Sequence, residues 1–270
     1  MAASIGRAMR RTAVMVLSYR IRAGPTPARL SLVCGRYAAS RRPEDLVEEF
    51  EVTGVGAGPE PLPGPDFNVA PGRDVLAVLV RPGPPARREL RALRWGLLPP
   101  WADDPAPGGL VNARVETAAD RPAFRAAWAG RRCLLPADGY YEWAGGPRRG
   151  VPRQPYFLHR SDGRGLALAG LYEVWRDRRR PGDDPAAWRW TCAVLTTTAE
   201  PDLAWLHPRM PVLLPPDRYT AWLDPGRPPG TVLDGLPPAG LLARPVSPRV
   251  NDVRQGGPDL VRRAEPATLF

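Results

Sequence analysis

Cys34 is the residue whose type and surroundings indicate chemistry most directly. It opens the segment Cys34-Gly-Arg-Tyr37, where glycine leaves room beside the thiol and Arg36 adds a positive charge that would lower a thiol pKa. Cys133 and Cys192 stand among apolar residues instead, which predicts buried strand residues that behave as small hydrophobes. An odd number of cysteines, 3, with no CxxC pair argues against a disulfide framework and against a zinc ribbon.

Several further short segments are dense in polar or aromatic residues that packing alone does not require. Taken singly each is a weak signal, because Asn112 is also a common turn residue, Glu142 a common solvated strand end and His207 a common loop histidine. The only other histidine is His159, so a mechanism that needs imidazole uses one of these two. The segments are Asn68-Val-Ala-Pro-Gly72, Trp95-Gly-Leu-Leu-Pro-Pro-Trp101, Asn112-Ala-Arg-Val-Glu-Thr117, Asp138-Gly-Tyr-Tyr-Glu-Trp143, His207-Pro-Arg-Met-Pro211 and Pro245-Val-Ser-Pro-Arg-Val-Asn251.

The elements that must position these residues are short. With 36 prolines and 27 glycines in 270 residues, the chain predicts many turns and little long helix. There is no regular alternation of strand and helix, which favours one α+β domain with an antiparallel sheet. Periodicity and turn residues predict helices at 43–50, 120–128 (with Asp120 as N-cap) and 216–223, strands at 74–80, 89–98, 132–136, 140–143, 155–159, 166–175 and 190–197, and loops at 54–65, 145–155, 176–185 and 225–239.

Taken together and in order, the seven segments resemble the SOS response-associated peptidase family, the abasic-site DNA-protein crosslinking proteins. The resemblance covers about residues 33–262. It implies a single α+β domain at 34–262 with a mainly antiparallel, barrel-like β core flanked by short helices, followed by a tail at 263–270. It also implies a peptidase that processes its own N-terminus and a lyase-like activity on DNA. The implied partner is single-stranded DNA that contains abasic sites, with no cofactor and no metal.

The chemistry that the resemblance implies needs an N-terminal cysteine. An abasic site opens to an aldehyde, and a 1,2-aminothiol attacks an aldehyde first through nitrogen, as a Schiff base, and then through sulfur to close a thiazolidine. Cys34 would supply both nucleophiles. By resemblance, Asn112 would hold the amine or the sugar oxygen, Glu142 would be the general acid and base, and His207 would be the second proton-transfer group.

The resemblance also implies a set of DNA-binding residues. Arginines in the motifs would bind phosphates beside the lesion, and tryptophans would stack on bases or wedge between them. An asparagine and a proline would shape the floor of the cleft. These residues are Arg36, Arg114 and Arg209, then Trp95, Trp101 and Trp143, then Asn68 and Pro71.

The residue before Cys34 departs from the family's usual Met-Cys-Gly-Arg start. Val33 stands there, and residues 1–33 hold 6 arginines and no acidic residue. We expect first that residues 1–32 come from a start codon placed too far upstream, with a GTG start written as Val33. Self-cleavage before Cys34 ranks second and a targeting peptide third.

Two other functions remain open at this stage. Cys34, His207 and Asn112 would also form the Cys-His-Asn set of a thiol hydrolase, and a chain rich in arginine and aromatic residues also suits a non-covalent single-stranded nucleic-acid binding module. The net charge of +10 does not decide, because all 38 basic residues are arginine, as GC-rich coding alone would give. No stretch approaches the roughly 20 apolar residues of a membrane span, so we expect a cytoplasmic monomer that associates with the nucleoid when it binds DNA.

Overall fold

The structure is a computed structural model that describes residues 34–56, 61–81, 83–84, 86–103, 108–145 and 153–264. The chain divides into two units, Met1–Ser31 and Leu32–Phe270, and every described residue belongs to the second unit. The expected extension at residues 1–33 and most of the expected tail at 263–270 lie outside the described residues.

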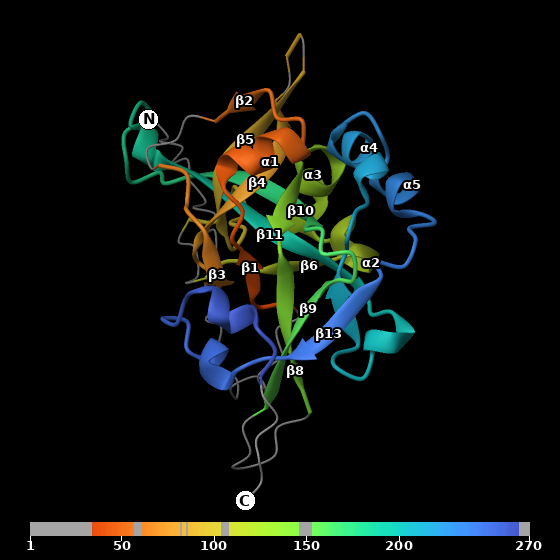
Figure 1. Ribbon diagram of the computed structural model, residues 1–270. Helices are drawn as coiled ribbons and strands as arrows, with labels where there is room; N and C mark the ends of the chain where they lie inside the picture. Colours follow the sequence, from red (N-terminus) through yellow and green to blue (C-terminus); the bar gives the residue numbers. More distant parts are fainter. Residues whose placement is uncertain are drawn as a thin grey trace, which may run out of the picture. The chain divides into compact units, whose positions relative to one another are not determined.

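Five strands close into a barrel (Figure 1). Four of the five neighbouring pairs are antiparallel, and the parallel pairing of Cys192 with Trp95 joins the first and last strands of the ring. The strands in ring order are β11 (Trp188–Thr198), β10 (Leu166–Arg176), β7 (Arg132–Ala137), β4 (Asp74–Arg81) and β5 (Arg87–Trp95). This arrangement confirms the predicted α+β fold with a mainly antiparallel, barrel-like core.

Three short strands extend the barrel sheet. β2 (Gly54–Val55) runs parallel to β5, β6 (Asn112–Arg114) runs parallel to β11, and β12 (Arg209–Pro211) runs antiparallel to β11. β6 and β12 both pair with the last residues of β11, at Val194–Thr196 and Thr196–Thr198 respectively. The segments that carry Asn112 and His207 therefore both reach the same end of one barrel strand.

A second sheet of five strands carries the other two predicted catalytic residues. Its order is β13 (Leu241–Pro245), β9 (Gln154–Arg160), β8 (Gly139–Ala144), β1 (Tyr37–Ala39) and β3 (Asp66–Val69). Figure 1 shows β8, β9 and β13 side by side, as their antiparallel registers require. Cys34 lies just before β1, and Glu142 lies within β8, which pairs with β1 through Tyr37 and Tyr140.

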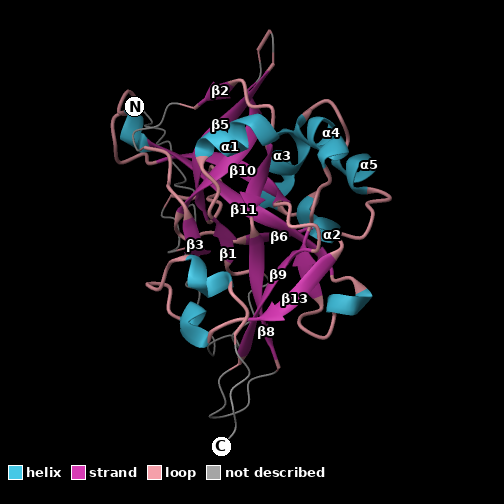
Figure 2. Cartoon of the chain, in the orientation of Figure 1, coloured by secondary structure: helices cyan, strands magenta, loops and turns pink. Residues whose placement is uncertain are grey.

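The faces of these sheets are covered by different parts of the chain. One face of the barrel strands packs against the helices through Leu46, Phe124 and Trp222, and the other packs against the second sheet through Tyr37 and Tyr140. The C-terminal segment covers the far face of the second sheet. The helices, drawn cyan in Figure 2, are α1 (Pro43–Glu49), α2 (Val115–Ala118), α3 (Pro122–Gly130), α4 (Tyr219–Leu223) and α5 (Pro229–Leu233). In the described part of the chain, no helix has the length and apolar character needed to cross a membrane.

The longer elements of the structure were predicted and are confirmed, whereas its short strands were not predicted. Proline begins each 3-10 turn, since its fixed φ suits a first helical position; these turns are Pro185–Ala187, Pro201–Leu203, Pro216–Arg218, Pro248–Asn251 and Pro258–Val261. The predicted N-cap Asp120 is wrong, because α3 is preceded by Arg121 and begins at Pro122 with no side-chain cap. The predicted loops at 54–65 and 225–239 contain β2 and α5, and β1, β3, β6, β12 and β13 were not predicted.

Candidate active site

Cys34 and Glu142 meet between the two sheets. The backbone N–H of Cys34 donates a hydrogen bond to Oε2 of Glu142 at 3.3 Å. Side chains alternate along a strand, so Glu142 shares a face of β8 with Tyr140, which packs in the same apolar cluster as Cys34. Cys34 is fully buried and Glu142 is 5% exposed, so the pair is shielded from bulk water.

Burial controls the proton affinity of both groups. It raises the pKa of the Cys34 thiol well above the usual value, and the Glu142 carboxylate raises it further. This corrects the prediction that the thiol pKa is lowered, since the Arg36 guanidinium points to other partners. Burial also raises the pKa of Glu142 to about 7. Hydrogen bonds from the backbone of Cys34 and Trp143 and the charge of Arg153 lower this pKa, but they do not offset the effect of burial. A carboxyl group with this pKa both gives and takes a proton near neutral pH.

His207 is held by the backbone of the next strand. Nδ1 of His207 accepts a hydrogen bond from the N–H of Arg209 at 3.1 Å and lies 3.2 Å from the carbonyl oxygen of the same residue. Burial lowers the pKa of His207, against a hydrogen bond with the backbone of Arg209 that raises it, and the charges of Arg209 and Arg153 also lower it. Since Arg153 lowers the pKa of both Glu142 and His207, its charge acts on both predicted proton-transfer groups.

Asn112 begins β6, and its position depends on a buried tryptophan. Nε1 of Trp95 donates to the carbonyl oxygen of Val111 at 3.0 Å, and Asn112 pairs with Val194 in the neighbouring strand β11. The Trp95 side chain is 0% exposed and packs on Tyr37. The prediction that Trp95 stacks on DNA is therefore wrong, and its role is to fix the strand that carries Asn112.

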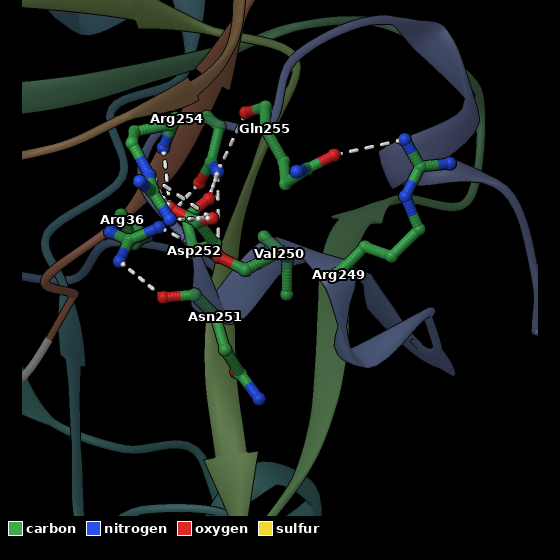
Figure 3. A network of polar contacts seen from close by, with 8 residues as sticks. Arg36, Arg249, Val250, Asn251, Asp252, Arg254 and Gln255 are labelled. Carbon is green, nitrogen blue, oxygen red and sulfur yellow. Dashed lines mark hydrogen bonds and ion pairs between the residues drawn. The ribbon is translucent and has the colours of Figure 1, made fainter.

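Arg36 and Asn68 hold the C-terminal segment against the second sheet, and Figure 3 shows Arg36 beside Asn251 and Asp252 of this segment. Nη1 of Arg36 donates to Oδ1 of Asn68 at 2.6 Å and to the carbonyl oxygen of Val250 at 2.8 Å. Nδ2 of Asn68 donates to the carbonyl oxygens of Asp252 and Gln255, both at 3.0 Å. Arg36 therefore serves the fold of this segment, which differs from its predicted phosphate contact. Asn68 is 2% exposed, and the prediction that it shapes the floor of the cleft stays a prediction.

The other two predicted arginines differ in exposure. Arg209 is mostly buried, and it donates to Glu116 through both Nη atoms and to the carbonyl oxygen of Thr196. The charge on Arg209 is thus paired inside the protein, which differs from the predicted phosphate contact. Arg114 ends β6, two residues after Asn112, and its side chain is exposed. Of the three predicted phosphate contacts, Arg114 is the one that faces solvent.

Trp101, Trp143 and Pro71 lie nearer the surface. Trp101 is 52% exposed, and the neighbouring Ala102 accepts a hydrogen bond from Nε1 of the buried Trp175 at 2.6 Å. Trp143 alternates with Glu142, so it lies on the opposite face of β8, where Nε1 donates to Oδ1 of Asn251 at 2.7 Å. Pro71 is half-buried in the turn between β3 and β4.

Comparisons with known proteins identify the family of this chain. The family model described as SOS response associated peptidase (SRAP) matches residues 33–253. The chain belongs to this family. SRAP relatives include abasic site processing protein YoqW of Bacillus subtilis, 32% identical over 85% of this chain and 99% of that protein. Abasic site processing protein YedK of Escherichia coli is also 32% identical over 85% of this chain and 99% of its own length.

Solved structures show the same fold. A crystal structure of a protein from Bacteroides thetaiotaomicron superposes with a TM-score of 0.69 at 20% identity, and it covers 86% of this chain and 100% of its own. A Bordetella bronchiseptica protein gives a TM-score of 0.62 at 28% identity, over 79% of this chain and 100% of its own. The SRAP fold thus accounts for nearly all of the second unit.

Three residues near the SRAP site were not predicted from the sequence. Arg153 was assigned to a surface loop, although it immediately precedes β9 and acts on Glu142 and His207. Tyr156 pairs with Glu142 across β8 and β9, and it contacts Trp205. The signal available in the sequence was the position of Trp205, two residues before His207. Among the described residues, no group of three or more His, Cys, Asp and Glu side chains is placed to hold a metal ion.

Proposed function

We propose that this chain processes abasic sites in single-stranded DNA by forming a thiazolidine with Cys34. The observation that carries the proposal is the 3.3 Å contact between the Cys34 nitrogen and a carboxyl group whose pKa is raised to about 7. The relatives named abasic site processing proteins match nearly their full lengths, which supports the same substrate for this chain.

The first step activates the amine. When Cys34 is N-terminal its nitrogen is an ammonium group, and the Glu142 carboxylate accepts one proton from it. An α-amino group has a pKa of roughly 7.7 to 8.0, about one unit above that of Glu142, so this transfer is nearly balanced. The free amine then adds to the aldehyde carbon of the opened sugar and forms a carbinolamine.

The second step loses water and closes the ring. Protonated Glu142 returns its proton to the carbinolamine hydroxyl group, which leaves as water and gives an iminium ion. The Cys34 sulfur attacks the iminium carbon, the nitrogen keeps the electron pair of the C=N bond, and the thiol proton goes to the Glu142 carboxylate. The product holds one C–N and one C–S bond to the sugar carbon, and one water has been released.

The buried thiol suits this order of events. Its raised pKa keeps the sulfur protonated while the amine reacts, so the nitrogen attacks first. The sulfur then attacks from within the same residue. Its proximity to the iminium carbon makes this step fast, so a lowered thiol pKa is not needed. Asn112, in β6, and His207, just before β12, would orient the sugar and assist its opening, since both strands pair with the end of β11.

The surface residues suit a single strand. Arg114 offers an exposed guanidinium on the same strand as Asn112, and Trp101 offers a half-exposed ring for stacking on a base. A single strand lets the abasic sugar reach a buried cysteine without breaking base pairs. One chain supplies Cys34, Glu142 and His207, so a monomer within residues 34–262 would be sufficient, and the crosslink would shield the lesion from strand cleavage.

The peptidase activity that the family name implies would expose the Cys34 amine. Cys34 has a φ of 45°, a left-handed conformation that costs a non-glycine residue energy and that exists only while Val33 is attached. Hydrolysis of the Val33–Cys34 bond adds water to the Val33 carbonyl group and releases the Cys34 nitrogen, which takes its proton from Glu142 3.3 Å away. The same carboxyl group would thus serve both reactions.

The thiol hydrolase alternative has less support. A Cys-His hydrolase relies on a thiol pKa lowered by a neighbouring imidazolium ion. Here burial and Glu142 raise the thiol pKa, and burial lowers that of His207. Both shifts oppose a thiolate-imidazolium pair.

A denaturing gel tests the proposal. A chain that starts at Cys34 is incubated with a single-stranded oligonucleotide that contains one abasic site, beside a matched Cys34→Ser chain and a chain with Val33 retained by an uncleavable linkage. We expect an SDS-resistant shifted band with the first chain alone. DNA binding on a native gel with no SDS-resistant band would instead support the non-covalent binding module.

A further inference from the structure

The loop between β11 and β12 holds a tryptophan outward beside the site. Leu203 and Leu206 are buried in the apolar cluster that contains Cys34, whereas Trp205 between them is 56% exposed. Backbone hydrogen bonds from Leu203 to Glu200 and from Leu206 to Leu203 fix the loop at both anchors. The exposure of Trp205 is therefore set by an ordered loop.

A tyrosine supports the exposed ring and connects it to the site. The Trp205 and Tyr156 rings lie 5.1 Å apart at 90° in an edge-to-face contact, and more than half of the Trp205 surface remains exposed. Tyr156 pairs directly with Glu142 across β8 and β9, and paired residues in an antiparallel sheet share a face. His207 follows Trp205 by two residues. The aromatic pair thus borders the same site as Cys34, Glu142 and His207.

The chemistry of an abasic site indicates what this pair would bind. The lesion has no base on which a side chain could stack. A protein that binds the strand there can gain stacking energy only from the base of a neighbouring nucleotide. An open indole face stacks on any base, because every base has a π-face. The positive charge of Arg153, which acts on both Glu142 and His207, adds attraction for the phosphates around the same nucleotide.

We propose that Trp205, supported by Tyr156, stacks on the base of a nucleotide next to the abasic site. This inference rests on the proposed function, and it adds a residue that determines affinity for the strand without taking part in bond formation. It predicts that stacking occurs on one side of the lesion only, because a single loop presents the ring.

Non-covalent affinity is measured with a single strand that carries a tetrahydrofuran abasic analogue, which cannot open to an aldehyde. We expect Trp205→Ala to raise Kd about ten-fold, within the range known for loss of one base-aromatic stack, and Trp205→Phe to raise it less than three-fold. Trp188→Ala is the matched control, since Trp188 is 43% exposed and lies at the opposite end of β11 from the residues that pair with β12. Its Kd should equal that of the wild type.

Two further readouts separate this inference from the proposed function. With 2-aminopurine on the 5′ or the 3′ side of the analogue, wild-type protein should quench its fluorescence on one side, and Trp205→Ala should relieve that quenching. At saturating aldehyde-bearing DNA, Trp205→Ala should still give the SDS-resistant band, which also shows that it is folded. An unchanged Kd or quenching on neither side, while the wild type crosslinks, overturns the inference; a wild type that forms no crosslink overturns the proposed function instead.

Discussion

The backbone nitrogen of Cys34 lies 3.3 Å from Oε2 of Glu142, although 108 residues separate them in the chain. β1 and β8 bring them together, and burial between the two sheets raises the pKa of both side chains. A carboxyl group placed at the nitrogen, with a pKa near that of an α-amine, is suited to move one proton on and off that nitrogen.

Replacing Glu142 by glutamine should slow crosslink formation about 100-fold, as expected for loss of a general acid-base group. Glutamine keeps the size and a hydrogen-bond acceptor for the Cys34 nitrogen but transfers no proton. The measurement is the single-turnover rate of the SDS-resistant band at saturating abasic DNA. Equal rates for both proteins would remove Glu142 from proton transfer.

Glu142 should also make stability depend on pH in the chain whose Cys34 nitrogen is still an amide. Its folded pKa of about 7 lies above the usual 4.5, so the folded state binds more protons between these values and its stability falls as pH rises through them. The loss amounts to about 3 kcal/mol of unfolding free energy. Urea unfolding from pH 4 to pH 8 should show this decline in the wild type and a flatter profile in Glu142→Gln; parallel profiles would contradict it.

Removing the charge of Arg153 should shift the pH dependence of crosslinking. Arg153 lowers the pKa of both Glu142 and His207, so Arg153→Gln should raise both. The Glu142 carboxylate must be ionised to take a proton from the amine, and the acid limb of the rate profile should therefore move to higher pH by about half a pKa unit. Arg153→Lys, which keeps the charge, is the control and should resemble the wild type.

The sequence predicted the barrel better than the site. Strands of eight to eleven residues such as β4, β10 and β11 carry enough apolar residues to be recognised, whereas three-residue β1 and β6 form only because a neighbouring strand pairs with them. The motif around Cys34 indicated the residue that we propose as the reactive one. Its raised thiol pKa was not predictable, because that shift comes from burial by residues distant in sequence.

The sequence also did not predict which arginine side chains are exposed. Arg36 and Arg114 stand in similar glycine- or alanine-containing motifs, and nothing local separates them. In the structure Arg36 donates to Asn68 and to the carbonyl oxygen of Val250, more than 200 residues away, whereas Arg114 is exposed. Only the tertiary fold decides which guanidinium group is open to a ligand.

Truncating Arg36 should therefore affect stability more than DNA binding. Arg36→Ala leaves Oδ1 of Asn68 without its donor and removes the 2.8 Å hydrogen bond to the carbonyl oxygen of Val250, which should lower the unfolding free energy by about 2 kcal/mol. It should also speed proteolysis of the segment after Pro245. Arg114→Ala is the comparison, and its unfolding free energy should stay within about 0.5 kcal/mol of the wild type.

Truncating Arg114 should weaken DNA binding while leaving the chemistry intact. Loss of one phosphate contact should lower the slope of log affinity against log salt by about 0.7 for a single strand. Titration with abasic-analogue DNA at several salt concentrations measures this slope. An unchanged slope would show that Arg114 does not contact the backbone.

Mass analysis of the DNA adduct tests the central claim most directly. The protein that starts at Cys34 is crosslinked to abasic single-stranded DNA, digested, and its N-terminal peptide is fragmented. The thiazolidine predicts an adduct one water lighter than the sum of peptide and sugar, attached through both nitrogen and sulfur of Cys34, with no free thiol there and no change on reduction with borohydride. An adduct at any other residue, or one at Cys34 that retains a free thiol and is reduced by borohydride, would contradict it.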